Sequence, residues 1–209
     1  MKNTHIVITL SLLVIVISSG CLSKIAGNGT LSNLDMVGKD VYSSQALMFE
    51  MKMPEGWKDD ALWTYPYGGA VNFVTDKYPW WPSGDDGAIR LDLQKYGTLS
   101  IVQVGMDTQT VPAGYTLEYA RSEELKRKDG ITYEGDTTLA GEKAWEIIRK
   151  YRTVGDLYQR DIHVVHKQRS YVLRFQVIST DAQKRDNVTA ELESDFNGFS
   201  SSFRFIDQI

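Results

Sequence analysis

Apolar and polar residues alternate with a period of two along much of the chain after residue 46. Successive side chains of a β-strand point to opposite faces of the sheet, so this alternation predicts strands with one buried face. The sequence Pro54-Glu55-Gly56-Trp57 predicts a turn after the first of these strands, and we expect Trp57 to lie in the core. Strands are expected near residues 47–53, 71–73, 89–93 and 99–104.

The pattern becomes helical at residues 115–128, where good helix formers dominate. Glu123 and Glu124 lie four residues before two basic residues, which is the favourable order for ion pairs along a helix. Asp129-Gly130 is expected to end this helix, because Gly readily adopts the left-handed conformation of a C-terminal cap.

The last third of the chain predicts four strands and a second helix. Gly155-Asp156 between two of the strand segments is typical of a hairpin turn. Apolar residues then recur every three or four positions from Val188 to Phe203, which is the buried stripe of a helix, and Phe205 belongs to a short last strand. The four strands are expected near residues 131–139, 143–153, 157–166 and 170–178.

This order of elements indicates an α+β fold, with an antiparallel β-sheet and helices packed on it. The segment from residue 46 to residue 209 is expected to form one domain, since its length suits a single hydrophobic core.

The amino terminus has the features of a secretory signal. Lys2 provides a positive start, and Ile6 to Ile17 is an uninterrupted run of apolar and hydroxyl residues. A helix that spans the hydrocarbon of a membrane needs roughly 20 apolar residues, and this run is shorter. We therefore expect residues 1–20 to be a cleaved signal peptide, with an uncleaved amino-terminal anchor as the alternative.

The small residues Ser18-Ser19-Gly20 directly before Cys21 resemble the lipobox of prokaryotic lipoproteins, in which the cysteine is lipidated and becomes the first residue. That pattern usually has Leu where this chain has Ser18. Lipidation would remove the unpaired thiol that a lone cysteine leaves in an oxidising compartment. The resemblance implies a lipid anchor on Cys21 at the extracytoplasmic face of the cell membrane. The alternative is an ordinary signal peptide followed by an incidental cysteine.

Residues 21–45 are rich in Gly, Ser and Asn and show no sustained period, so we expect a lipidated flexible tether. Asn28 and Asn187 begin glycosylation sequons, which are frequent by chance. The full chain has a net charge of −4, and removal of residues 1–20 takes away one basic residue and no acid. An acidic chain argues against nucleic acid and anionic lipid as partners.

Residue types that carry chemistry are scarce. His163 and His166 fall at the end of a predicted strand, where their spacing puts them on opposite faces, so we expect no joint metal site. The usual interpretation of such a pair is a surface strand end. Sequence signatures of nucleophilic, nucleotide-binding and zinc enzymes are missing, and we expect no cofactor. An enzyme that uses carboxylates stays open.

Aromatic residues concentrate between residues 57 and 87. Aromatic side chains on a loop offer flat apolar faces and hydrogen-bonding edges, which suit the recognition of a sugar, a cation or a protein. Such residues also often cap the core of a sheet, and the adjacent Asp85 and Asp86 do not follow the spacing of a calcium-binding loop. The candidate binding residues are Trp63, Tyr65, Tyr67, Tyr78, Trp80, Trp81, Asp85 and Asp86.

Three stretches together resemble the PsbP-like family, named for an extrinsic subunit of plant photosystem II. They are MFEMKMPEGWKDD from residue 48, DTTLAGEKAWEIIRKY from residue 136, and SYVLRFQVIST from residue 170 followed by a helix and SSFRFI. The resemblance covers about residues 46–207 and implies an antiparallel sheet between helical layers. It implies an accessory or binding protein, often secreted or lipid-anchored in prokaryotes, and brings no catalytic residues.

The sequence therefore supports three hypotheses about function. The first is a membrane-anchored extracytoplasmic lipoprotein that acts as a binding or accessory module for an envelope protein, a membrane complex or a surface ligand. The second is an extracytoplasmic hydrolase with carboxylate chemistry on the same scaffold. The third is a structural envelope protein.

Overall fold

The computed structural model describes residues 40–78, 100–152 and 155–207. The predicted signal peptide, Cys21, the Asn28 sequon and the strand expected at 89–93 lie outside the described residues.

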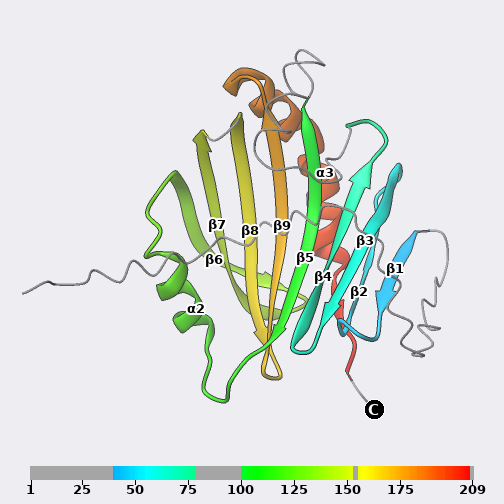
Figure 1. Cartoon of the computed structure of the whole chain (residues 1–209), viewed down its shortest axis with the longest axis vertical. Helices are drawn as coiled ribbons and strands as arrows, with labels where there is room; N and C mark the ends of the chain where they lie inside the picture. The colour runs from blue at the N-terminus through cyan, green and yellow to red at the C-terminus, as the bar shows by residue number, and fades with distance from the viewer. Residues whose placement is uncertain (1–39, 79–99, 153–154, 208–209) are drawn as a thin grey trace, which may run out of the picture.

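Seven antiparallel strands form the main sheet, in the order β3-β4-β5-β9-β8-β7-β6 (Figure 1). Consecutive strands pair as hairpins except at the centre, where β5 pairs with β9 although a helix and three strands separate them in sequence. This long-range pairing joins the two halves of the sheet at its middle. Its strands are β3 (Trp57–Tyr65), β4 (Gly68–Thr75), β5 (Ile101–Thr110), β6 (Ile131–Leu139), β7 (Glu142–Arg152), β8 (Asp156–His166) and β9 (Arg169–Ser179).

A second, small sheet consists of β1 (Val41–Ser44), β2 (Phe49–Lys52) and β10 (Arg204–Phe205), with β2 in the middle. Tyr42 of β1 is buried and packs edge-on against Phe73 of the main sheet, with ring centroids 5.1 Å apart. The expectation of a flexible tether up to residue 45 is therefore wrong for residues 41–44, because the apolar body of Tyr42 joins the core.

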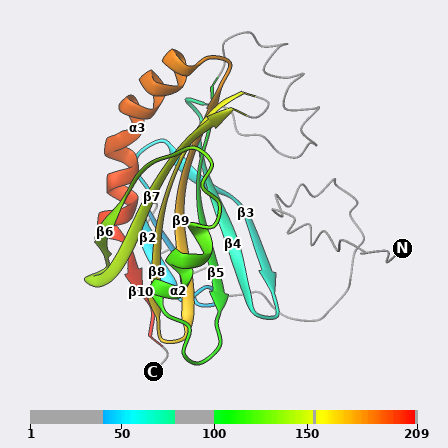
Figure 2. The ribbon, with the colours of Figure 1, turned by 90° about the vertical axis from the view of Figure 1, so that its left-hand side faces the viewer.

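The helix α3 (Ala182–Ser202) runs along one face of the main sheet (Figure 2). It begins at the N-cap Asp181, whose side chain accepts a hydrogen bond of 2.8 Å from the backbone of Lys184. Its buried stripe confirms the predicted helix. Residues of this stripe and the facing strands form the core, among them Val188, Leu192, Phe196, Phe199, Phe73, Val104, Leu173 and Phe175.

The helix α2 (Leu117–Glu124) is capped by Thr116, whose hydroxyl accepts from the backbone of Tyr119 at 3.1 Å. It confirms the helix predicted at 115–128, with fewer turns. Glu124 of α2 pairs with Arg149 of β7 at 3.1 Å. Among the described residues, no helix has both the length and the apolar character to cross a membrane.

The two helices lie against opposite faces of the sheet. On β7, Lys150 contacts Asp186 of α3 at 2.9 Å, whereas its sequence neighbour Arg149 contacts α2. Neighbouring residues of a strand point to opposite faces, so one face belongs to each helix. We call these the α3 face and the α2 face. The predicted α+β class, an antiparallel sheet between helical layers, is confirmed.

The four strands predicted in the last third of the chain are confirmed to within one residue at each end. The hairpin between β7 and β8 is confirmed by their pairing, although residues 153–154 of its turn lie outside the described residues. The strand predicted at 99–104 continues to Thr110, and β3 follows the predicted turn at Trp57. Trp57 is buried and packs edge-on against Phe199, which confirms its place in the core.

Candidate functional site

Polar side chains from the three central strands meet in the middle of the α2 face. The register places Gln103 of β5 beside Gln176 of β9, which in turn lies beside Gln159 of β8. One pleat further along, Arg174 of β9 lies beside Asp161 of β8. We name the resulting group the polar cluster. It comprises Gln103, Asp107, Gln159, Asp161, Arg174 and Gln176.

The three glutamines of the polar cluster form a directed chain of hydrogen bonds. Gln159 donates its amide to Asp161 Oδ2 at 2.7 Å, and its carbonyl accepts from Gln176 at 2.9 Å. The carbonyl of Gln176 accepts in turn from Gln103. An ionised carboxylate can accept but not donate, so Asp161 fixes the orientation of all three amides.

Asp161 and Arg174 form the charged centre of the polar cluster. The Asp161 side chain is 1% exposed, and its two oxygens accept from Arg174 Nε at 2.9 Å and from Arg174 Nη2 at 3.2 Å. Burial alone would raise the pKa of Asp161, but the paired guanidinium outweighs it and holds that pKa below its usual value. Burial opposes the charge of Arg174, yet the two facing carboxylates raise its pKa above the usual value.

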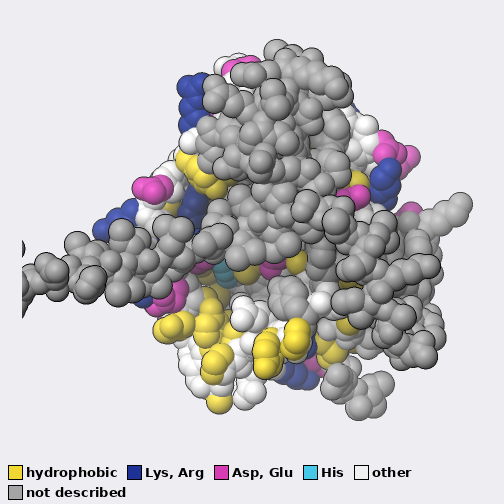
Figure 3. All heavy atoms as spheres, viewed as in Figure 1, with side chains coloured by type: hydrophobic (Ala, Val, Ile, Leu, Met, Phe, Trp, Pro, Cys, Tyr) yellow, Lys and Arg dark blue, Asp and Glu magenta, His cyan; other side chains and the backbone are white. Residues whose placement is uncertain are grey.

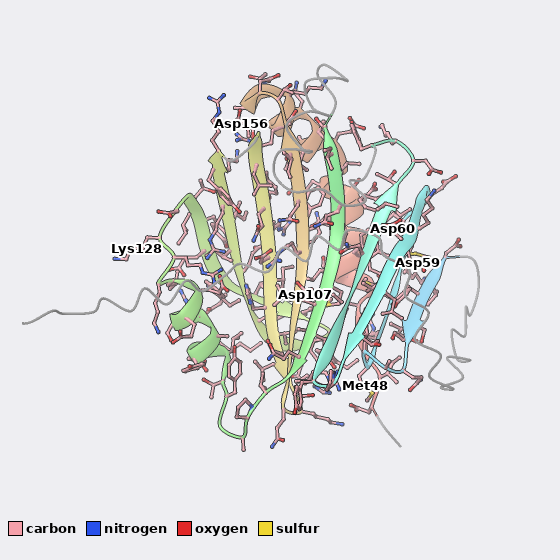
Figure 4. All side chains as sticks on the ribbon, viewed as in Figure 1. Met48, Asp59, Asp60, Asp107, Lys128 and Asp156 are labelled. Carbon is pink, nitrogen blue, oxygen red and sulfur yellow. The ribbon has the colours of Figure 1, made fainter. Side chains whose placement is uncertain are left out.

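Asp107 is the outer carboxylate of the polar cluster, and Figure 4 shows it near the centre of the sheet. Its side chain is 46% exposed, and it contacts Arg174 Nη1 at 3.5 Å, the longest contact of that guanidinium with a carboxylate. Partial burial raises the pKa of Asp107, the charge of Arg174 opposes this, and the charge of Asp161 adds to the rise. Asp107 is thus a weakly paired acid next to a tightly paired one.

His163 lies on the same face, beside the polar cluster. It is 5% exposed, stacks at a tilt on Trp145 with ring centroids 5.0 Å apart, and has no hydrogen-bond partner at Nε2 within the described part of the chain. Burial lowers the pKa of His163, which the charge of Asp161 partly offsets. The interpretation of His163 as a surface strand end is wrong, because α2 and its partners cover this part of the sheet.

The predicted separation of the two histidines is confirmed. His166 stacks on Phe205 of β10 with ring centroids 4.0 Å apart, on the side of α3 and the small sheet. Its Nδ1 lies 2.7 Å from Glu142 and its Nε2 lies 3.1 Å from Asp207. Within the described ranges, no group of three or more His, Cys, Asp or Glu side chains is placed to hold a metal ion.

The α2 helix is held to β6 and β7 at one edge of the sheet by charged contacts. Arg121 bonds Glu134 and Asp136 of β6, and its guanidinium lies 5.7 Å from the ring of Trp145. Trp145 itself donates its indole N–H to Glu134 at 3.3 Å. The α2 helix therefore covers one edge of the α2 face, whereas the side chain of Asp107 in the polar cluster is partly exposed.

Chemically, the polar cluster suits recognition more than catalysis. The carboxylate of Asp161 is saturated by Arg174 and Gln159, and its lowered pKa makes it a poor general acid. The amides of Gln103 and Gln176 and the carboxylate of Asp107 offer hydrogen bonds in fixed directions, which is what selective binding of a polar ligand requires.

The residues predicted for aromatic binding fall in several places. Tyr67 is 71% exposed in the turn between β3 and β4, and Figure 3 shows hydrophobic side chains gathered at this lower end of the view. Tyr78 lies beyond the other end of β4, where its hydroxyl donates to Glu191 of α3 at 2.6 Å. An eight-residue strand is roughly 27 Å long, so these two tyrosines do not share one site.

For the other residues of that prediction, the structure does not describe the side chains. Trp63 and Tyr65 belong to β3 by their backbone. Trp80, Trp81, Asp85 and Asp86 lie outside the described residues. The aromatic binding role of this region stays a prediction, and the polar cluster is a separate group that sequence reasoning missed.

A groove of about 1080 Å³ lies between the small sheet and α3. Its floor includes Ser194, Gly198 and Ser201 of α3, and Glu50, Lys52 and Arg204 stand around it. Lys52 and Arg204 are exposed at this groove and Ser202 is bonded to the backbone of Lys52. The groove offers no network of fixed polar groups like that of the polar cluster within the described residues.

No protein-family model matches the sequence, and no curated protein matches it. Several solved structures are similar to this chain, among them the following two. The cyanobacterial PsbP protein CyanoP of Synechocystis sp. PCC 6803 is 14% identical, with 85% of this chain and 99% of that chain covered and a TM-score of 0.47. LpqN, involved in cell envelope biogenesis of Mycobacterium tuberculosis, is 16% identical, with 76% and 83% covered and a TM-score of 0.38. At these identities the likeness concerns the fold alone, and with both TM-scores below 0.5 it supports no conclusion about function.

Proposed function

We propose that this chain is an extracytoplasmic accessory or binding protein, held at the membrane by a lipid on Cys21, that recognises its ligand on the α2 face of the sheet. The support comes from the chain's own residues. The amino terminus resembles a lipoprotein signal. The domain after it carries a polar cluster on the α2 face, whose side chains are fixed by hydrogen bonds to one another. An ordinary solvent-facing side of a sheet would instead carry separate polar side chains.

The polar cluster is the observation that carries the proposal. A buried charged pair contributes little to net stability, because the loss of hydration offsets much of the attraction. The pair between Asp161 and Arg174 is extended by three amides whose orientations it fixes. Groups held rigidly in this way lose little entropy when a ligand binds, which favours selective recognition.

The anchoring is tested by fractionation of cells that produce the full chain. The wild-type chain should sediment with membranes and stay there after a high-salt wash, because a lipid anchor does not depend on charge. The Cys21→Ser chain should move to the soluble fraction. Recovery of the wild type in the soluble fraction, or of Cys21→Ser on membranes, would contradict the lipid anchor.

The binding face is tested by photo-crosslinking in intact cells. A photoreactive residue in place of Asn72, on the α2 face of β4, should capture a partner or ligand. The matched control replaces Asn187, an exposed residue of α3 on the other side of the sheet, and should capture less. Equal capture from both positions would contradict the assignment of binding to the α2 face.

A further inference from the structure

Two turns and the segment that follows β5 are joined at one end of the main sheet. The backbone N–H of Thr110 donates to the carbonyl of Tyr67, in the turn between β3 and β4, at 2.6 Å. The next residue, Val111, donates to the carbonyl of Gln168, in the turn between β8 and β9, at 2.9 Å. These bonds make one platform, which we name the tyrosine end. It comprises Pro66, Tyr67, Thr110, Pro112, Ala113, Tyr115 and Tyr119.

Apolar side chains are exposed at the tyrosine end. Tyr67 is 71% exposed and Tyr119 is 52% exposed, and Tyr115 packs edge-on against Tyr119 with ring centroids 5.1 Å apart. Pro112 and Ala113 are exposed between them in sequence. Figure 3 shows hydrophobic side chains on this lower end of the visible face. Exposed aromatic residues that gather in one place mark a surface for contact, whereas single ones do not.

The tyrosine end also lacks charge. The sequence has no charged residue from Ala61 to Thr75 or from Thr108 to Leu117, although 24% of the whole chain is charged. The acids that border it each contact a basic side chain. These pairs are Asp107 with Arg174 at 3.5 Å, Glu118 with Lys143 at 3.1 Å, and Asp207 with Lys167 at 2.7 Å. The partner of this surface therefore has to be recognised without ion pairs.

Tyrosine suits the boundary between a membrane and water. Its ring is apolar and its hydroxyl bonds to water or headgroups, so tyrosine is enriched at the level of the lipid headgroups. The chain is acidic overall, and its charge would not favour anionic lipid. An uncharged aromatic end is the part of such a chain that can lie on a bilayer without electrostatic cost.

The predicted anchor can bring this end to the membrane. Residues 22–39 lie between Cys21 and Asp40, the first described residue, and a chain of this length reaches up to about 60 Å. Asp40 leads directly into the short strand β1, and the turn after β1 lies at the level of the tyrosine end. There the carbonyl of Met48 accepts from the hydroxyl of Tyr171 at 3.4 Å, and Tyr171 pairs with Thr108 near the end of β5.

Resting on the lipid anchor of the proposed function, we infer that the tyrosine end docks on the bilayer that holds this anchor. Tyr67 and Tyr119 lie in the headgroup region, and Pro112 and Ala113 contact it between them. The opposite end of the sheet, where α3 begins, points away from the membrane. Docking gives the domain a fixed orientation, which the anchor alone does not provide.

The test measures how close the tyrosine end lies to lipid. The full chain with Ala113→Cys, purified from membranes, is labelled with a fluorophore and reconstituted in phosphatidylcholine vesicles. Some of the vesicles contain spin-labelled phosphatidylcholine, which quenches a fluorophore on contact. The label at residue 113 should lose most of its fluorescence there. A label at residue 187 (Asn187→Cys), near the start of α3 and beyond the other end of β9, should keep its fluorescence.

A tyrosine variant and a matched control test the assigned contact. Tyr67→Ser, made in the chain labelled at residue 113, should reduce the quenching several-fold, because an aromatic ring is removed from the interface. Tyr133→Ser removes a tyrosine that is 47% exposed in the middle of β6 and should leave the quenching unchanged. Circular dichroism checks that both variants keep the fold. Quenching should persist at high salt, since the contact is uncharged.

The inference is overturned if residue 113 is quenched no more than residue 187, if the two tyrosine variants behave alike, or if high salt abolishes the quenching. Capture of a second copy or another protein by a photoreactive residue at position 113, without lipid quenching, would also overturn it and assign this end to a protein interface. Failure of the anchor gives a different result, because the chain without an added cysteine would then be labelled at Cys21 and would not float with the vesicles. A chain that floats with the vesicles but is not quenched at residue 113 keeps the anchor and loses only the docking.

Discussion

The two faces of the seven-stranded sheet are filled by opposite chemistry. On the α3 face, aromatic rings pack against each other, as Phe175 does on Phe196 with centroids 5.3 Å apart. On the α2 face, the same strand β9 presents Arg174 and Gln176 to other polar side chains. A single strand thus contributes to an apolar core with one set of residues and to a polar network with the other.

The two faces contribute differently to stability. Burial of apolar area on the α3 face supplies the driving force for folding, roughly in proportion to the area removed from water. The polar cluster on the α2 face adds little net free energy but becomes costly when one member is removed, because its partner is then left unpaired. The fold can therefore keep a polar network on the α2 face because the α3 face stabilises it.

The largest effect should follow from a cavity in the α3 face. Phe199 is fully buried and lies 5.2 Å from Trp57 and 5.4 Å from Phe73 between ring centroids. Phe199→Ala should lower the free energy of unfolding by about 3–5 kcal/mol, measured by urea denaturation. Tyr119→Ala, at a residue that is 52% exposed, is the control and should change it by less than about 0.5 kcal/mol. Similar losses in both variants would contradict the assignment of the core.

The next largest effect should come from breaking the charged pair on the α2 face. Asp161→Asn leaves Arg174 without its main partner and should destabilise the fold by roughly 3 kcal/mol, the low end for buried pairs because Arg174 is 30% exposed. Replacing both partners, as Asp161→Leu with Arg174→Met, should recover part of this loss. A double variant that is less stable than the sum of the single variants would contradict a network limited by unpaired charge.

How well each face could be predicted from the sequence follows from the same contrast. The alternation of Tyr171, Leu173 and Phe175 and the helical stripe ending at Phe203 both mark positions on the α3 face directly. Hydrophobic periodicity reports local burial, and these residues are buried by elements that the pattern itself reveals. The core positions on the α3 face, the two helices and the four strands of the last third of the chain were accordingly predictable.

The polar cluster was not predictable in this way. In the sequence, Asp161, Arg174 and Gln176 look like the solvent-facing positions of strands. Only the pairing of β5 with β9, which are far apart along the chain, brings Gln103 beside Gln176. The sequence of one strand carries no record of its long-range neighbour, so this site required the structure.

A smaller effect distinguishes the faces by pH. His163 is buried on the α2 face, and its pKa lies below the ordinary value of 6.5 because burial disfavours its charged form. The unfolded chain therefore binds more protons as the pH falls below about 6.5, and the folded state loses stability by up to about 1.4 kcal/mol per pH unit. The groups that face His163 are Asp161, Glu124, Arg174 and Arg149.

Urea denaturation of the wild type between pH 7.5 and pH 5.5 should show this decline, and His163→Phe, which cannot titrate, should show a shallower one. The pH range stays above the titration of Asp161, whose lowered pKa would remove stability at more acidic pH. Parallel pH profiles of the two chains would show that the titration of His163 does not cause the loss of stability at lower pH.

The smallest effect compares the caps of the two helices. Thr116→Ala removes the N-cap of α2 and Asp181→Ala removes that of α3, each at a cost of about 1 kcal/mol. Because α3 belongs to the core, the loss at Asp181 should appear in global unfolding. The short α2 is held at the sheet edge mainly by polar contacts such as that between Glu124 and Arg149, so the loss at Thr116 should instead appear as faster hydrogen exchange of the α2 amides. Exchange that rises equally throughout the chain in Thr116→Ala would show that α2 unfolds with the core, and the two faces would then share one cooperative unit.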